Sequence, residues 1–96
     1  MNCKVEIKKS SKKDKKLMAI FSNCSTRKTV HFGAAGYSDL TIHRDEARKL
    51  RYLKRHQKNE HWNDPFTAGS LSRWVLWNKV SLKDSIADYK KRFGFN

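Results

Sequence analysis

The apolar residues of this chain recur with two different periods, and the change between them restricts the folds that the chain can adopt. Before residue 33, apolar and polar residues alternate in the run from Cys3 to Lys8, which is typical of a strand with one buried face, and a compact apolar run from Leu17 to Ser22 has the length of a second strand. From residue 44 onward, apolar residues recur three and four positions apart, as they do in amphipathic helices. We therefore expect an α+β fold in which the strands come first and the helices pack on one face of a small sheet.

Three strands are predicted in the N-terminal part, at about residues 2–9, 17–23 and 28–32. The segments between them are short and polar, so they predict turns, and the strands should form an antiparallel meander. Gly33 and Gly36 then interrupt the pattern, because two glycines three positions apart after a strand indicate a turn with positive φ angles. The residues from this turn to Ile42 are expected to form a loop.

Three helices are predicted in the remaining part, at about residues 44–58, 65–77 and 82–93. In the first of them, Ala47, Leu50 and Leu53 form an apolar stripe. The second should begin at Asp64-Pro65, since a capping side chain followed by proline is a helix-start signal, and a break is expected near residues 67–69.

The third predicted helix carries the clearest local signals. Ser81 and Asp84 form a variant of the capping box at its start, and Gly94 is suited to end it. Its apolar stripe, which we expect to be buried, consists of Leu82, Ile86, Tyr89 and Phe93.

The length of 96 residues is too short for two domains, so we expect a single domain over residues 1–96. A chain of this size buries only about 60–65% of its unfolded surface, so its core should be thin and a deep pocket beside the core is not expected. The longest apolar run near the N-terminus is much shorter than a membrane span.

Catalytic and metal-binding patterns are not found in the sequence. The four histidines lack the spacing of metal ligands, since His56 and His61 are five positions apart and no HExxH pattern occurs. No GxSxG pattern or reactive-cysteine context supplies a nucleophile. We therefore expect no enzyme, no metal, no cofactor and no small-molecule substrate.

Two cysteines, Cys3 and Cys24, are too few to suggest a disulfide framework, and no CxxC pattern occurs. We expect a reduced setting in which both are small core residues. If residues 2–8 and 17–23 are paired strands, the two thiols could be neighbours, so whether they pair stays open at this point.

The charge of the chain points to an anionic partner. Lysine and arginine number 22 against 9 acidic residues, which gives a net charge of +13. A charge of this size favours nucleic acid or an anionic membrane surface as partner. Within the first predicted helix, five cations recur at intervals of four, three, four and three, and so share one face: Arg44, Arg48, Arg51, Arg55 and Lys58.

These arginines are the main candidate for a nucleic-acid site, because guanidinium groups match the geometry of phosphate. The alternative is an ordinary solvated helix face. A second candidate is the lysine-rich turn between the first two strands, although it is at least as well explained as a solubilising hairpin tip. Its cations are Lys12, Lys13, Lys15 and Lys16.

The segment of residues 71–77 is apolar around nearly its whole circumference, which exceeds what a thin core can cover. Its tryptophans belong either to the core or to a contact with a partner, where aromatic residues act as anchors. We expect Leu76 or Trp77 to be partly exposed. Trp62, Leu76 and Trp77 are therefore the candidates for a protein interface.

Three stretches together resemble a family of small basic proteins encoded by giant DNA viruses, such as chlorella viruses and relatives of mimivirus. They are residues 28–43, Trp62-Asn-Asp-Pro-Phe-Thr-Ala-Gly69 and Ser72-Arg-Trp-Val-Leu-Trp-Asn-Lys79, within a likeness that covers residues 28–94. The chain departs from the family at Leu40, where the family has an aromatic residue, and at Val80, where proline is frequent. The family has no assigned activity, so the resemblance implies only a viral origin, a host cytoplasm or viral factory, and packaging in a virion.

These observations lead to two hypotheses. The first is a non-enzymatic viral structural protein that binds a polyanion, DNA above all, without sequence preference. The second is a minor capsid or cement protein that docks on other capsid proteins or on the anionic inner membrane through residues 62–77 and its basic surface.

Overall fold

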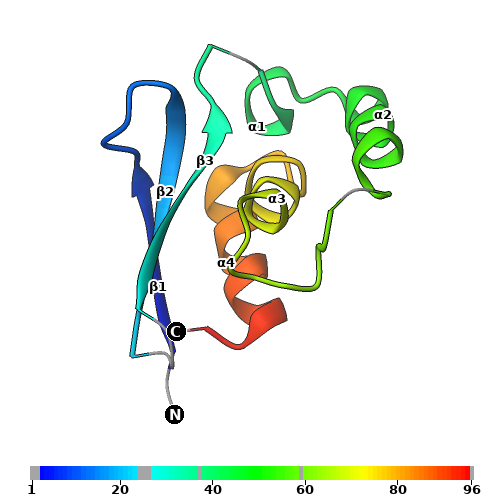
Figure 1. Ribbon diagram of the computed structural model, residues 1–96. Helices are drawn as coiled ribbons and strands as arrows, with labels where there is room; N and C mark the ends of the chain where they lie inside the picture. The colour runs from blue at the N-terminus through cyan, green and yellow to red at the C-terminus, as the bar shows by residue number, and fades with distance from the viewer. Residues whose placement is uncertain (1–2, 24–26, 37, 59, 96) are drawn as a thin grey trace.

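The computed structural model describes residues 3–23, 27–36, 38–58 and 60–95. Three antiparallel strands form one sheet in the order β1-β2-β3, and the helices cover one of its faces (Figure 1). The strands are β1 (Lys4–Lys9), β2 (Lys15–Ser22) and β3 (Lys28–Ala34). The predicted α+β fold, with the sheet first and the helices after it, is confirmed.

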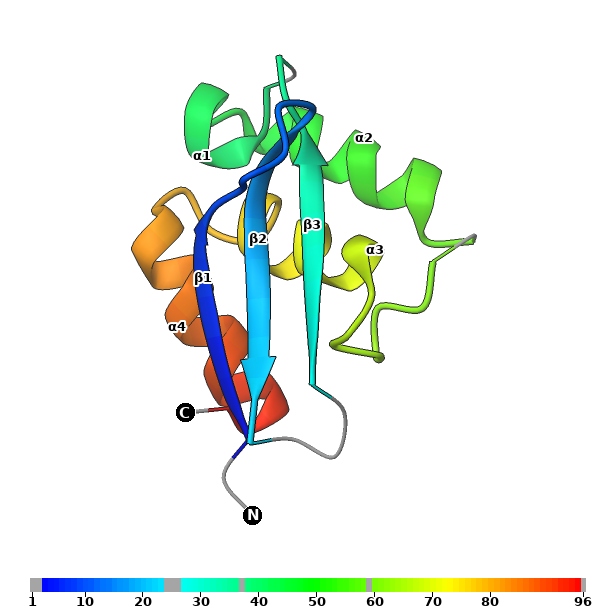
Figure 2. The same cartoon turned by 60° about the vertical axis from the view of Figure 1, so that its left-hand side comes forward.

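The register of the sheet places its apolar side chains on the face that the helices cover. Val5 pairs with Phe21 between β1 and β2, and Leu17 pairs with Phe32 between β2 and β3. Val5, Phe21 and Phe32 are buried, as is Ala19 in the centre of β2. Figure 2 shows the three strands side by side with the helices behind them. The alternation in the sequence therefore becomes one buried and one open face of the sheet.

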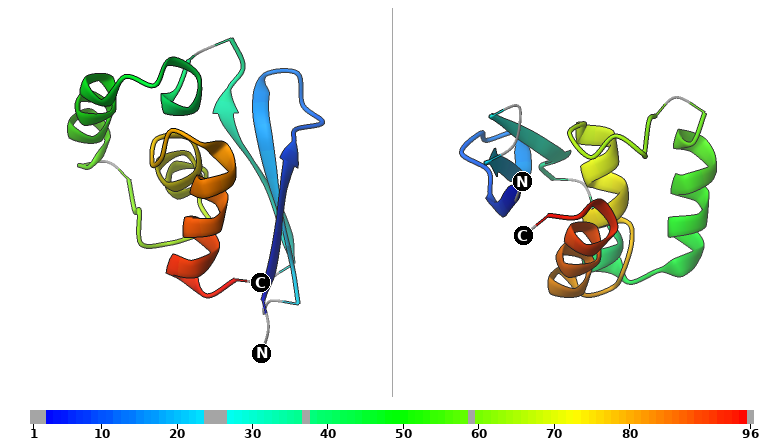
Figure 3. Two further views of the ribbon diagram at one scale, coloured as in Figure 1. Left: turned by 180° about the vertical axis from the view of Figure 1, so that it is seen from behind. Right: turned by 90° about the horizontal axis from the view of Figure 1, so that it is seen from below.

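Five helical elements follow the sheet: α1 (Leu40–His43), α2 (Glu46–His56), α3 (Ala68–Leu71), the π-helical turn η1 (Ser72–Leu76) and α4 (Leu82–Phe93). Figure 3 shows that α3, η1 and α4 lie next to the sheet and that α2 lies farther from it. None of the helices in the described ranges is long and apolar enough to cross a membrane.

Two helix starts differ from the sequence prediction. Residues up to Ile42 were expected to form a loop, but α1 begins at Leu40, because the side chain of Asp39 accepts a hydrogen bond from the Thr41 amide. The predicted start at Asp64-Pro65 is wrong, since Asp64 instead closes a turn by accepting from the Phe66 amide.

The second predicted helix begins where a break was expected. Thr67 caps α3 by accepting a hydrogen bond from the Ser70 amide at 3.1 Å. The helix then widens into η1, where the Trp77 amide donates to the Ser72 carbonyl at 3.0 Å. This wider turn carries Leu76 to the sheet and Trp77 to α2.

The core lies between the sheet and the layer formed by α3, η1 and α4. Phe21 of β2 meets Phe66 and Phe95 in edge-on and tilted ring contacts, and Tyr89 of α4 stacks on Phe95. Tyr89 is fully buried and donates its hydroxyl hydrogen to the Pro65 carbonyl at 2.6 Å. These rings join the end of the chain to the middle strand.

The apolar stripe predicted for α4 is only partly buried. Tyr89 is in the core, whereas Leu82 is 37% exposed, so its expected burial is wrong. Ser85 is fully buried instead, and its hydroxyl bonds to the backbone amide and carbonyl of Lys79. The predicted caps are confirmed, since Ser81 accepts from the Asp84 amide and Gly94 ends the helix with a positive φ.

Cys3 is disulfide-bonded, so the expectation that it is a free core thiol is wrong. Cys24, the other cysteine of the sequence, lies outside the described residues.

Candidate polyanion-binding cleft

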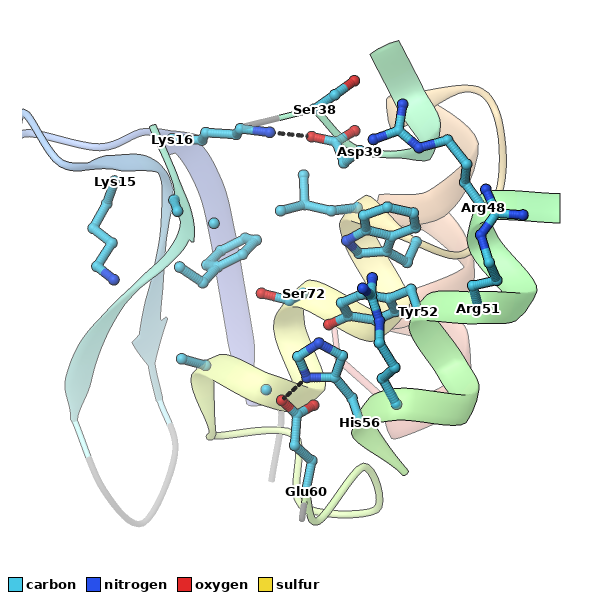
Figure 4. A pocket seen from close by; sticks show the side chains of 18 residues that line it. Lys15, Lys16, Ser38, Asp39, Arg48, Arg51, Tyr52, His56, Glu60 and Ser72 are labelled. Carbon is cyan, nitrogen blue, oxygen red and sulfur yellow. Dashed lines mark hydrogen bonds and ion pairs between the residues drawn. The ribbon is translucent and has the colours of Figure 1, made fainter. Parts of the chain in front are cut away.

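A cleft of about 650 Å³ opens between the ends of β2 and β3 on one side and α2 on the other (Figure 4). Segments α3 and η1 form its floor. No deep pocket was expected beside so thin a core, and this site is an open cleft at the surface. The cleft is lined by Lys15, Lys16, Phe32, Gly33, Ala34, Ser38, Asp39, Arg48, Arg51, Tyr52, Arg55, His56, Glu60, Ala68, Gly69, Ser72, Leu76 and Trp77.

The position of α2 is set by three side chains spaced three and four residues apart. Lys49 donates to the Asn78 carbonyl at 2.7 Å, Tyr52 is buried, and Nδ1 of His56 lies 3.0 Å from a carboxylate oxygen of Glu60. These residues share one face of the helix. Because Arg48, Arg51 and Arg55 each precede one of them by a single residue, the arginines lie on the adjoining face, which borders the cleft.

The apolar stripe expected for this helix is mostly exposed. Leu50 is 66% exposed and Ala47 is also exposed, while Leu53 is half-buried. The most buried side chain of the helix is Tyr52, and Lys49 adds a hydrogen bond from its ammonium group. The buried face of α2 lies about one residue of helical rotation away from this stripe.

A column of aromatic rings forms the inner wall of the cleft. The rings of Tyr52 and Trp77 stack with centroids 4.3 Å apart and an angle of 4°. His56 stacks on Tyr52, also at 4.3 Å, and His43 contacts Trp77 at 5.2 Å in a tilted geometry. Tyr52 therefore has a stacked ring neighbour in both His56 and Trp77, and Trp77 contacts the rings of Tyr52 and His43.

Each carboxylate of the cleft is neutralised or hydrogen-bonded by its neighbours. Asp39, only 2% exposed, accepts from Lys16 Nζ at 2.6 Å and from the amide and hydroxyl of Thr41. Glu60 contacts His56 with one oxygen and accepts from the Trp62 indole with the other, at 2.7 Å. These interactions tie the sheet to α1 and α2 to the segment before α3.

The arginines of the cleft have no such partners. Within the described ranges, the ion pairs closer than 4.0 Å include no guanidinium group of Arg48, Arg51 or Arg55. Burial raises the pKa of the Tyr52 hydroxyl above its usual value, and the charge of Glu60 raises it further. Tyr52 therefore adds no negative charge at neutral pH, and the cleft has an excess of positive charge.

The structure divides the predicted nucleic-acid residues into two groups. Arg48, Arg51, Arg55, Lys15 and Lys16 line the cleft, and the charge of Lys16 is taken up by Asp39. The remaining four do not line the cleft: Arg44 ends α1 in a left-handed conformation, Lys58 lies beyond the end of α2, and Lys12 and Lys13 are exposed in the hairpin turn.

The three predicted interface residues have different surroundings. Leu76 is only 4% exposed and packs against Gly33, so its assignment to an interface is wrong. Trp77 is half-buried in the ring column, and its remaining surface faces the cleft. Trp62 is half-buried as well, and Arg73 lies 5.5 Å from its ring centre.

Trp74, on the η1 turn, lies between two guanidinium groups. Arg73 and Arg92 lie 4.1 and 3.8 Å from its ring centre. Burial lowers the pKa of the Arg73 guanidinium, and the neighbouring charge of Arg92 lowers it further. This cluster is separate from the cleft lining and stabilises the packing of η1 on α4 through cation–π contacts.

Several cleft residues were missed by the sequence analysis, among them Tyr52, His56, Glu60 and the serines at 38 and 72. A signal existed for two of them, since His56 and Glu60 are four residues apart and of pairable type. Among the described residues, no group of three histidine, cysteine or acidic side chains could hold a metal ion.

Comparisons with known proteins give one match. No curated protein and no solved structure matches the chain significantly. A protein family described as "Family of unknown function (DUF5754)" matches residues 5–56, which are more than half of the chain. The matched segment runs from β1 to the end of α2 and includes every arginine of the cleft. The chain therefore belongs to the family of unknown function DUF5754.

Proposed function

We propose that this protein binds the phosphate backbone of nucleic acid, with DNA as the main partner, through the cleft beside α2. The observation that carries the proposal is the convergence of Arg48, Arg51 and Arg55 with Lys15 around one concave site. None of the three guanidinium groups takes part in a close ion pair within the described ranges.

Physical chemistry favours phosphate as the bound group. Guanidinium groups present paired N–H donors that match two phosphate oxygens. Cations held this close repel one another, and a polyanion relieves the repulsion, all the more in a chain of net charge +13. Since contacts to phosphate carry no sequence information, binding should not depend on base sequence.

The resemblance to proteins of giant DNA viruses extends this proposal to a setting. We propose a non-enzymatic structural protein of the virion that accompanies viral DNA. The alternative, a capsid protein that docks through residues 62–77, has less support, because Leu76 belongs to the core and Trp77 belongs to the ring column.

The salt dependence of DNA binding tests the proposal. Each phosphate that a cation neutralises contributes about 0.9 to the slope of log K against log salt concentration, so the triple variant Arg48→Gln/Arg51→Gln/Arg55→Gln should reduce the slope by about two to three. Glutamine has nearly the helix propensity of arginine, so α2 should remain folded.

A matched control removes the same charge elsewhere. Lys54, Lys83 and Lys91 are exposed and do not line the cleft. The variant Lys54→Gln/Lys83→Gln/Lys91→Gln should leave most of the slope in place. Equal slopes for the two triple variants would mean that the cleft is not the binding site.

A further inference from the structure

The lining of the cleft changes in chemical character with depth. Arg48, Arg51 and Arg55 are exposed, whereas the buried lining groups are the apolar Phe32 and Leu76, the ring of Tyr52 and the carboxylate of Asp39. The carboxylates are already satisfied by partners within the chain. A ligand with negative charge at one end and a neutral body matches this arrangement.

The volume of the cleft exceeds what a phosphate group needs. At about 650 Å³ it is in the range of sites for organic ligands, which is about 300–1,000 Å³. Small residues line the cleft, and at two of these positions an added side chain would clash with a neighbouring residue. A Cβ atom on Gly33 would lie 2.7 Å from Leu76, and one on Gly69 would lie 3.0 Å from Glu60.

The ring column limits how a base can be held. Stacking needs a free aromatic face, and Tyr52 is already stacked with both His56 and Trp77. A neutral group in the cleft therefore meets ring edges and hydroxyl groups, such as that of Ser72, which Figure 4 shows near the floor. Such contacts discriminate weakly between bases.

On the basis of the function proposed above, we propose that the cleft takes an unpaired nucleotide of a single strand. Its flanking phosphates bind the arginines of α2, and its sugar and base occupy the neutral interior. In duplex DNA the bases are stacked and paired, so a nucleotide enters only after it is unstacked at a cost of about a few kcal/mol. The protein should therefore prefer single-stranded over duplex nucleic acid of the same length.

A variant that fills the cleft without changing its charge tests this inference. Ala68 is exposed at the start of α3 and lines the cleft, whereas Ala87 is exposed on α4 outside it. With a fluorescent oligothymidylate of about 15 nucleotides as probe, Ala68→Trp should weaken binding about tenfold. A duplex of the same length should bind Ala68→Trp within about twofold of the parent. Ala87→Trp, the matched control, should leave both affinities unchanged.

Three further outcomes would overturn the inference. They are equal binding of single strand and duplex by the parent, equal binding of an abasic strand and the oligothymidylate, and competition by thymidine monophosphate as strong as that by the strand. Each of them leaves the salt-slope test of the arginines unaffected, so this inference can fail while the proposed function holds. If the arginine variant leaves the salt slope unchanged, the proposed function itself fails.

Discussion

At the scale of single residues, Gly33 is the glycine at which an added side chain would meet the closest contact. Its φ angle is +78°, and an added Cβ would lie 2.7 Å from Leu76 Cδ1. Gly36 has a similar φ of +88° but open space around it. Strain in the left-handed region costs about 1–3 kcal/mol, and overpacking costs about 1–3 kcal/mol in addition. Gly33→Ala should therefore lower the free energy of unfolding by at least about 1 kcal/mol more than Gly36→Ala does in urea titrations. Equal losses would show that η1 does not pack closely on β3.

Residue-level features were predictable where their cause is local. The glycine turn, the Ser81 cap and the Gly94 cap depend on neighbours within a few positions, so the sequence indicated all three. The partner of Asp39 could not be predicted, because Lys16 is 23 positions away and only the packed sheet and α1 bring them together. The same holds for Tyr89 and the Pro65 carbonyl.

At the scale of elements, Tyr52 supplies the buried ring among the three side chains that hold α2 in place. Tyr52 joins Trp77 and His56, so Tyr52→Ala should cost about 3–5 kcal/mol, and Tyr52→Phe, which keeps the stacking, should cost less than about 1 kcal/mol. Thermal and urea unfolding would measure both. Leu50→Ala on the same helix is the control and should change stability by no more than about 0.5 kcal/mol, because Leu50 faces solvent. A larger loss for Leu50→Ala than for Tyr52→Ala would mean that α2 packs through its leucine stripe.

The elements themselves were largely predictable, but their orientations were not. The three strands and α4 appear close to their predicted ranges, because their periodicity is clean. For α2, a count of apolar residues favoured the leucine face, whereas the bonds of Lys49 and the stacking of Tyr52 determine the buried face. Helix α1 has only four residues, so it is too short to show a helical period in the sequence.

At the scale of the whole molecule, two buried tyrosines make stability sensitive to alkali. Burial raises the pKa of Tyr52 and Tyr89 in the folded state. Above about pH 10 the unfolded chain loses these protons while the folded chain keeps them, so the free energy of unfolding falls by about 1.4 kcal/mol per pH unit for each tyrosine. Urea unfolding between about pH 9 and 11 would measure this slope. The double variant Tyr52→Phe/Tyr89→Phe should have the shallower slope, and parallel curves would contradict the burial of both hydroxyls.

The change in the period of the apolar residues predicted the fold class, but no sequence pattern predicted the cleft. Its walls come from β2, β3, α2 and η1, which are distant in the sequence, and its width depends on how far α2 is held from the sheet. The charge of the chain indicated an anionic partner, but only the packing brings three of the arginines together with Lys15.

The order of the strands bears on whether copies of the protein aggregate at high concentration. Within the described sheet, β1 is an edge strand, and edge strands are where a second chain can add by backbone pairing. β1 carries the exposed lysines Lys4, Lys8 and Lys9 against one exposed acid, Glu6, which pairs with Lys8, so two free copies that approach through this edge meet an excess of like charge. Phosphates that neutralise the protein remove part of this repulsion. The lysines of β1, which lie outside the cleft, therefore oppose pairing of unbound copies through this edge, and phosphates bound nearby weaken this opposition.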